Sequence, residues 1–159
     1  MTPRRVQTAG YLVWQLSTKW RVAVDRALKD LGLTHADYLV LASLSECSRG
    51  GAKPSQRELA DFAGLDPMYV SKLVRSLEHA GLLRRLDHPD EARAFQLTLS
   101  ARGADLVERS AAVMRKLFDQ LLTPIGGRTA KRHAVLIQTL ETLLDEAEAA
   151  NASPRRKQK

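Results

Sequence analysis

Cysteine is almost absent from this sequence, since Cys47 is the only one among 159 residues. A single thiol excludes an internal disulfide and any metal site built on two cysteines. The four histidines also lack the spacing with which one helix presents two metal ligands. We therefore expect no structural metal, no cofactor and a reducing compartment, with Cys47 as a buried, unreactive thiol.

Long hydrophobic runs are missing as well. No apolar stretch approaches the roughly 18 to 20 residues that a helix needs to cross a bilayer. The basic residues near the N-terminus are not followed by the apolar block of an export signal. The chain is therefore expected to be soluble and cytoplasmic.

Signatures of catalysis are equally scarce. The sequence shows no Ser, His and Asp order around a nucleophile turn and no glycine-rich phosphate loop. An enzyme is therefore not expected, and binding is left as the class of function to examine.

Basic residues outnumber acidic ones, with 25 Lys and Arg against 18 Asp and Glu, a net charge of +7. The excess lies near the two ends, because residues 54–102 carry seven of each sign. Total charge is therefore weak evidence for a nucleic-acid partner, and placement matters more. In this neutral segment a local basic face is expected from Lys72, Arg75, Arg84, Arg85 and Arg93.

The same segment reads as two short helices joined by a tight turn. Ser55 and Glu58 have the spacing of a capping box at the start of the first helix, whose inward side is expected to hold Leu59 and Phe62. Asp66 followed by a proline begins the second, and Gly81 ends it in a left-handed conformation. This order predicts a helix-turn-helix.

Two strands are predicted directly after these helices. Alternating apolar residues favour a half-buried strand over residues 95–99, which can pair with residues 82–86 around a polar loop at 87–92. The fold class is therefore mainly α with a small β-wing: a winged helix-turn-helix lobe over residues 34–100.

Long helices flank this lobe. Apolar stripes at helical spacing predict a helix within residues 1–33 and further helices within 101–150. These stripes are expected to pack against a second copy as a dimerisation region, although packing within one chain stays an alternative. Residues 151–159 form a basic tail that is expected to be disordered.

The sequence resembles the multiple antibiotic resistance regulator (MarR) family of winged-helix transcription factors. The segments that carry the resemblance are LTHADYLVL at 33–41, ELA at 58–60, VSKLV at 70–74, LEHAGLLRR at 77–85 and LSARG at 99–103. The resemblance implies a homodimer that binds a pseudo-palindromic operator in double-stranded DNA, often as a repressor. It also implies release by a small effector, commonly phenolic or anionic.

Two features depart from the family pattern. The family's wing usually carries Asp-x-Arg, whereas Glu91, Ala92 and Arg93 stand here. Some members sense oxidants with a cysteine near the start of the first helix, whereas Cys47 lies at the end of the second predicted helix, near Arg49.

The candidate DNA contacts lie on the second helix of the helix-turn-helix, at the start of the first, and in the wing. They are Gln56, Arg57, Pro67, Met68, Tyr69, Ser71, Lys72, Arg75, Arg84 and Arg93. Side chains on the second helix can reach base edges or phosphates, whereas the helix start before it favours phosphate. An ordinary solvated helix face is the alternative for these residues.

Two wing arginines have a second interpretation. Arg84 and Arg85 either contact the DNA backbone or brace the wing through Asp87, Asp90 and Glu91, and bracing is favoured for Arg85.

Candidate effector-pocket residues follow from the resemblance, which places the effector between the dimer helices and the DNA-binding lobe. They are Tyr11, Trp14, His35, Tyr38 and Phe118. Aromatic residues at helical spacing also serve as core, so these positions have two interpretations.

Taken together, these features predict a homodimeric, sequence-specific DNA-binding regulator, and the resemblance implies a repressor relieved by an effector. The alternative is a winged-helix module that binds proteins without specific DNA binding, which the neutral middle segment leaves open.

Overall fold

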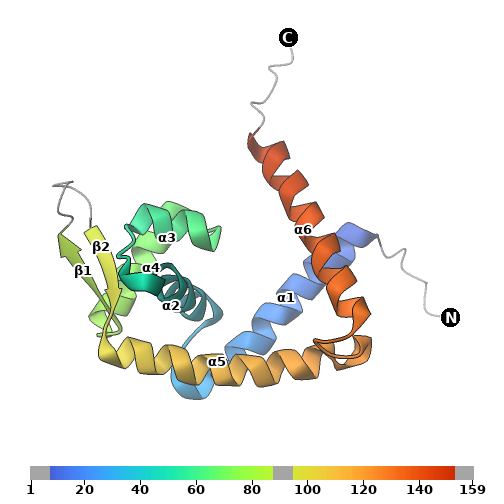
Figure 1. Cartoon of the computed structure of the whole chain (residues 1–159), viewed down its shortest axis with the longest axis horizontal. Coiled ribbons are helices and arrows are strands. Elements are labelled where there is room, and N and C mark those ends of the chain that lie inside the picture. The colour runs from blue at the N-terminus through green and yellow to red at the C-terminus, as the bar shows by residue number, and fades with distance from the viewer. Residues whose placement is uncertain (1–7, 88–94, 153–159) are drawn as a thin grey trace, which may run out of the picture. The chain divides into compact units, whose positions relative to one another are not determined.

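The computed structural model describes residues 8–87 and 95–152 (Figure 1), and for residues 151 and 152 it describes the backbone alone. It is mainly helical with one two-stranded antiparallel sheet, which confirms the predicted fold class. The chain divides into two compact units, with the boundary at Arg115 inside α5. The elements are α1 (Ala9–Leu28), α2 (His35–Cys47), α3 (Gln56–Ala63), α4 (Pro67–His79), β1 (Leu83–Asp87), β2 (Phe95–Leu99), α5 (Ala101–Leu122) and α6 (Lys131–Ala152).

The turn between α1 and α2 is held by side-chain caps. Gly32 takes the left-handed conformation there, with φ of 68°. Thr34 and Asp37 form a capping box, in which the Asp37 carboxylate accepts the Thr34 N–H at 3.0 Å. Asp25 of α1 adds a further cap, because its Oδ1 accepts the backbone N–H of His35 at 2.6 Å. The start of α2 is thus tied to the preceding helix.

The core of the first unit lies between the C-terminal half of α1, the helices α2, α3 and α4, and the sheet. Its fully buried side chains include Leu28, Leu41, Leu59 and Leu97. Phe62 is not part of this core, because 57% of it is exposed, so the predicted inward position was wrong. The buried side of α3 is formed by Leu59 and Ala60, and Phe62 faces solvent instead.

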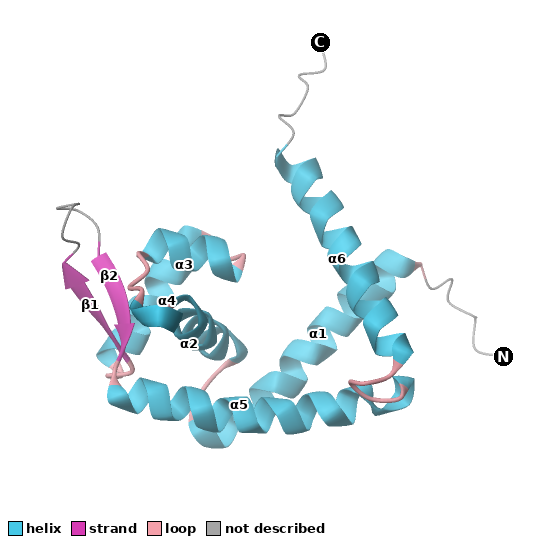
Figure 2. Ribbon diagram, viewed as in Figure 1, coloured by secondary structure: helices cyan, strands magenta, loops and turns pink. Residues whose placement is uncertain are grey.

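The wing is the antiparallel pair of β1 and β2 (Figure 2). Its register pairs Leu83 with Leu99 and Asp87 with Phe95. Its first strand starts one residue later than predicted, because the Leu82 N–H bonds instead to the carbonyl of Leu77 at the end of α4. The other edge of β2 is also engaged, since the Leu97 N–H donates to the Pro54 carbonyl at 2.8 Å. The segment before α3 therefore covers the outer edge of β2.

The alternation predicted for β2 holds only in part. Leu97 is fully buried, but Phe95 is 41% exposed at the end of the strand. The loop at residues 87–92 that was predicted to join the strands lies, from residue 88, outside the described residues, as does Arg93.

The start of α5 packs against the turn that follows α4. The Ser100 hydroxyl donates to the Gly81 carbonyl at 2.8 Å and accepts the N–H of Gly103 at 2.9 Å, so it caps α5 as predicted. Gly81 has φ of 72°, as expected for its left-handed position. At Gly103 a Cβ atom would collide with the carbonyl oxygen of Leu82, so only glycine fits there.

The second unit contains the end of α5, a short turn and α6. Asp119 pairs with Arg128 across the turn, with 2.8 Å between Oδ1 and Nε. Along α6 apolar side chains stay exposed in the single chain, namely Val135, Ile137, Leu140, Leu143 and Leu144. Within the described residues, no helix is long and apolar enough to span a membrane.

Candidate nucleic-acid interface

The helix α4 has one packed face and one open face. It begins at Pro67 because the Asp66 carboxylate accepts the Tyr69 N–H at 3.0 Å, while a proline at the first position sacrifices no hydrogen bond. Val70 and Val74 are fully buried. Of the contact residues predicted on this helix, Pro67, Met68, Tyr69, Lys72 and Arg75 are exposed, and Ser71 is half-buried.

The cations of this open face are available to an external partner. Arg75 donates from Nε to the Ser71 carbonyl at 3.3 Å, a bond that holds the side chain along the helix. Within the part of the chain that the structure describes, neither Lys72 nor Arg75 forms an ion pair. Exposed cations without acidic partners attract phosphate groups.

The start of α3 contributes Gln56 and Arg57. Ser55 and Glu58 form the predicted capping box, with the Ser55 N–H donating to Oε2 of Glu58 at 2.7 Å. Arg57 is exposed, whereas Gln56 is half-buried and its Oε1 atom is fully covered. Arg57 is therefore the more accessible of the two to a phosphate.

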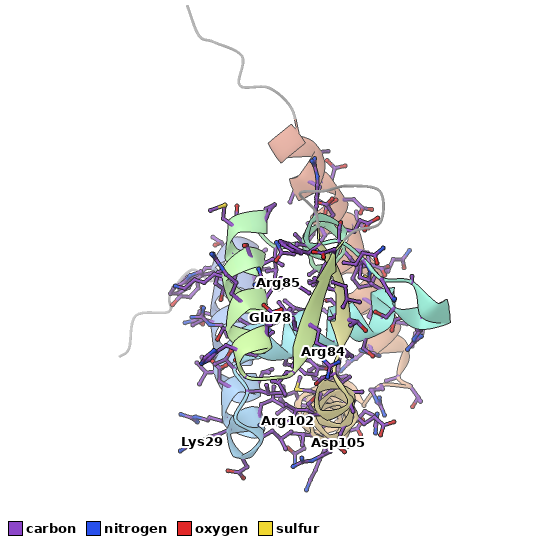
Figure 3. The ribbon with its side chains drawn as sticks, turned by 90° about the vertical axis from the view of Figure 1, so that its left-hand side faces the viewer. Lys29, Glu78, Arg84, Arg85, Arg102 and Asp105 are labelled. Atoms are coloured by element: carbon purple, nitrogen blue, oxygen red, sulfur yellow. The ribbon has the colours of Figure 1, made fainter. Side chains whose placement is uncertain are left out.

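The two wing arginines differ in their surroundings (Figure 3). Arg84 is exposed, and the described residues include no ion-pair partner for it. Arg85 is paired with Glu78 of α4, with 2.6 Å between Nη2 and Oε2, and its guanidinium lies 5.2 Å from the centre of the Phe95 ring. Arg85 was predicted to brace the wing through Asp87, Asp90 and Glu91, but the partner that the structure shows is Glu78 of α4. Asp90 and Glu91 lie outside the described residues.

A cavity of about 810 Å³ opens between α1, the start of α2 and the turn before α4. Of the predicted effector residues it is lined by His35, whereas Tyr11, Trp14, Tyr38 and Phe118 are not among its lining residues. The lining residues are Arg21, Val22, Asp25, Lys29, Gly32, Leu33, Thr34, His35, Ala36, Leu39, Leu65 and Tyr69.

Only aromatic residues and His35 were predicted for the effector pocket, so the charged residues that line this cavity were missed. A signal was present in the sequence, since Arg21 and Asp25 lie four positions apart on one face of α1 and Lys29 follows four positions later, directly after the helix end. Tyr69 joins them from α4, so the cavity borders the same helix that presents Lys72.

The aromatic residues that were predicted have other surroundings. Tyr11 and Trp14 lie side by side on α1 with 6.0 Å between ring centres. Burial raises the pKa of the Tyr38 phenol, and the Arg115 guanidinium opposes part of that rise. Tyr38 therefore stays a neutral hydroxyl near neutral pH.

Cys47 is half-buried rather than fully buried as predicted. Burial raises the pKa of its thiol, and the carboxylates of Glu46 and Glu58 raise it further. Arg49, the expected stabilising cation, pairs with Glu46 at 2.9 Å. The thiolate is therefore disfavoured, in agreement with an unreactive cysteine.

Comparisons with known proteins agree on one family. Residues 33–95 match the model of the MarR family. The uncharacterized HTH-type transcriptional regulator YdcH of Bacillus subtilis (strain 168) is 32% identical over 108 residues, 68% of this chain and 74% of YdcH. The HTH-type transcriptional repressor Rv2887 of Mycobacterium tuberculosis is 37% identical over 106 residues, 67% of this chain and 73% of that protein.

A solved structure extends the likeness over most of the fold. The M. tuberculosis transcriptional regulator MosR in complex with DNA has a TM-score of 0.75 to this chain, covering 91% of this chain and 98% of MosR. At 22% sequence identity this likeness shows a shared fold.

Proposed function

The chain belongs to the MarR family of DNA-binding transcriptional regulators and is not an enzyme, and we propose that it acts as a homodimeric repressor whose operator binding is relieved by a small molecule. The observation that carries the proposal is the open face of α4. That face carries Lys72 and Arg75, neither of which has an acidic partner among the described residues. A helix of this kind suits a major groove.

Dimerisation is supported by apolar surface that a single chain leaves open. On α1, Leu12, Val13, Trp14 and Leu16 are each more than 40% exposed, and α6 carries a similar set. Such surface is unfavourable in water and is covered in a stable protein. A second copy that covers it makes the assembly two-fold symmetric. Two α4 helices then meet half-sites about 10 to 10.5 base pairs apart, or a multiple of that.

Repression is supported by the name of one relative, since Rv2887 is a transcriptional repressor and shares 37% of the aligned residues. Effector relief is supported by the cavity beside α4. Its lining combines Arg21 and Lys29 with the Tyr69 ring and aliphatic side chains, a mixture that suits a compact aromatic anion. Such a ligand relieves repression only if it binds the DNA-incompetent arrangement more tightly.

The experiment that tests the proposal begins with selection of duplex DNA from a random library by the full-length protein. Gel shift of the recovered sequence at increasing salt then measures affinity, while light scattering measures the mass of the free protein. We expect a dimer, a palindromic site and an affinity that falls steeply with salt. A dimer that enriches no sequence would contradict the proposal and favour the protein-binding module.

Effector relief is tested on the same complex with salicylate as the probe. Release of the operator by salicylate, weakened by Lys29→Ala, would support an anion in the cavity. Binding that is unchanged at millimolar salicylate would contradict this part of the proposal for that class of anion.

A further inference from the structure

Met68 is the most exposed of the large apolar side chains in the described part of the chain, with 77% of its surface open. A single exposed apolar residue is ordinary on a protein surface. Its place, however, is the second residue of α4, where the neighbours Pro67 and Tyr69 are exposed as well. The helix does not need Met68 for packing, because Val70 and Val74 on its other side are fully buried.

Met68 shares a stripe of α4 with the two cations of the open face. Lys72 follows it by four positions and Arg75 by seven, which are the intervals at which helical residues lie above one another. The stripe therefore begins with an apolar tip and continues with two positive charges. A partner that fits it needs negative charge beside a small apolar group.

Duplex DNA offers that combination in its major groove. The first residues of a recognition helix meet base edges, and the cations behind them meet phosphates or guanine. Among the groups that bases present there, the C5-methyl of thymine is the apolar one, whereas cytosine presents an N–H donor that an apolar side chain cannot satisfy. The unbranched methionine side chain adapts to such a contact.

We propose that Met68 contacts the C5-methyl group of one thymine in each operator half-site and is thereby a specificity-determining residue. The inference rests on the proposed function, since it requires α4 to enter the major groove. It makes Met68 a source of sequence preference, and leaves Lys72 and Arg75 as the source of affinity for the DNA backbone.

The test replaces each thymine of the selected operator in turn by deoxyuridine, which removes the methyl group alone. Affinities are measured by fluorescence anisotropy with the full-length protein. We expect one thymine per half-site at which the replacement weakens binding about fourfold, and about sixteenfold in both half-sites together, the effect of one buried carbon each.

Two variants attribute this preference to Met68. Met68→Ala should bind the thymine and deoxyuridine operators equally, whereas Met68→Leu should keep the preference because it keeps an apolar contact. Lys72→Ala is the matched control on the same stripe, and it should weaken binding to both operators by the same factor.

The outcomes separate this inference from the proposed function. If the protein binds a specific site but no deoxyuridine replacement weakens that binding, the methyl contact is overturned and the proposed function as a regulator still holds. A Met68→Ala variant that keeps the preference for thymine would also overturn the methyl contact alone. Failure of the wild-type protein to select any DNA would overturn both.

Discussion

Arg85 of β1 and Glu78 of α4 form a salt bridge, reinforced by a backbone hydrogen bond, that joins the wing to α4. The Arg85 side chain donates to Oε2 of Glu78 from Nε at 2.7 Å, and its backbone N–H donates to Oε1 at 3.1 Å. Both side chains are 30% exposed, so solvent screens the pair only in part. One carboxylate of α4 thus bonds to both the side chain and the backbone of Arg85 in the sheet.

Removal of this carboxylate should lower the stability of the protein. Glu78→Ala breaks the brace and leaves a half-buried guanidinium without its partner, so the free energy of unfolding should fall by about 1 to 3 kcal/mol. Urea denaturation followed by circular dichroism measures the loss. Arg49→Ala is the control, because Arg49 is 78% exposed in its own pair and should change stability by no more than about 0.5 kcal/mol. Equal losses in the two variants would show that the brace is unimportant.

Gly103→Ala should destabilise the protein by about 1 to 3 kcal/mol, because its new methyl group collides with the Leu82 carbonyl and forces α5 away from the turn. Thermal unfolding measures this change. Gly10→Ala is the matched substitution, since it also lies in a helix but meets nothing within 4 Å. That variant should be unchanged or slightly more stable, because alanine favours helices. A tolerated Gly103→Ala would mean that α5 does not dock as described.

Replacement of Lys72 and Arg75 together should abolish operator binding and leave the proposed dimer intact. Two charged contacts of about 1 to 3 kcal/mol each would be lost, and the salt dependence of binding should become less steep. Gel shift and light scattering measure the two properties. Lys131→Ala with Arg132→Ala removes the same charge from the start of α6 and serves as the control. An unaltered affinity in the α4 double variant would exclude this helix from the interface.

Cys47 should react slowly with iodoacetamide at pH 8. Its raised pKa means that less thiolate is present at a given pH, so the rate should rise with pH and level off above the usual cysteine value of about 8.5. Glu46→Gln removes one of the charges that raise the pKa, and the curve should therefore shift to lower pH. A wild-type inflection below 8 would indicate an activated thiol instead.

Local features of this fold were predicted well from the sequence. Ser55 with Glu58, and Asp66 with Pro67, mark helix starts because a cap needs only residues within one turn. The open face of α4 was also correct, since helical spacing alone separates Val70 and Val74 from the residues around Lys72. These predictions depend on the geometry of a single element.

Features that depend on packing between elements were harder to predict. Phe62 looked like a core residue, but neighbouring elements determine which part of the short α3 is covered. Glu78 was not identified as the partner of Arg85, because the two lie on different elements. The charged lining of the cavity was also missed, because the spacing of Arg21 and Asp25 on α1 does not show that α2 and α4 lie beside them.

The cap that Asp25 provides for His35 has a mechanical consequence. This charge-assisted hydrogen bond of 2.6 Å ties the first turn of α2 directly to a side chain of α1. A rotation of α1 relative to α2 at this junction has to break that bond, at a cost of about 1.5 to 3 kcal/mol.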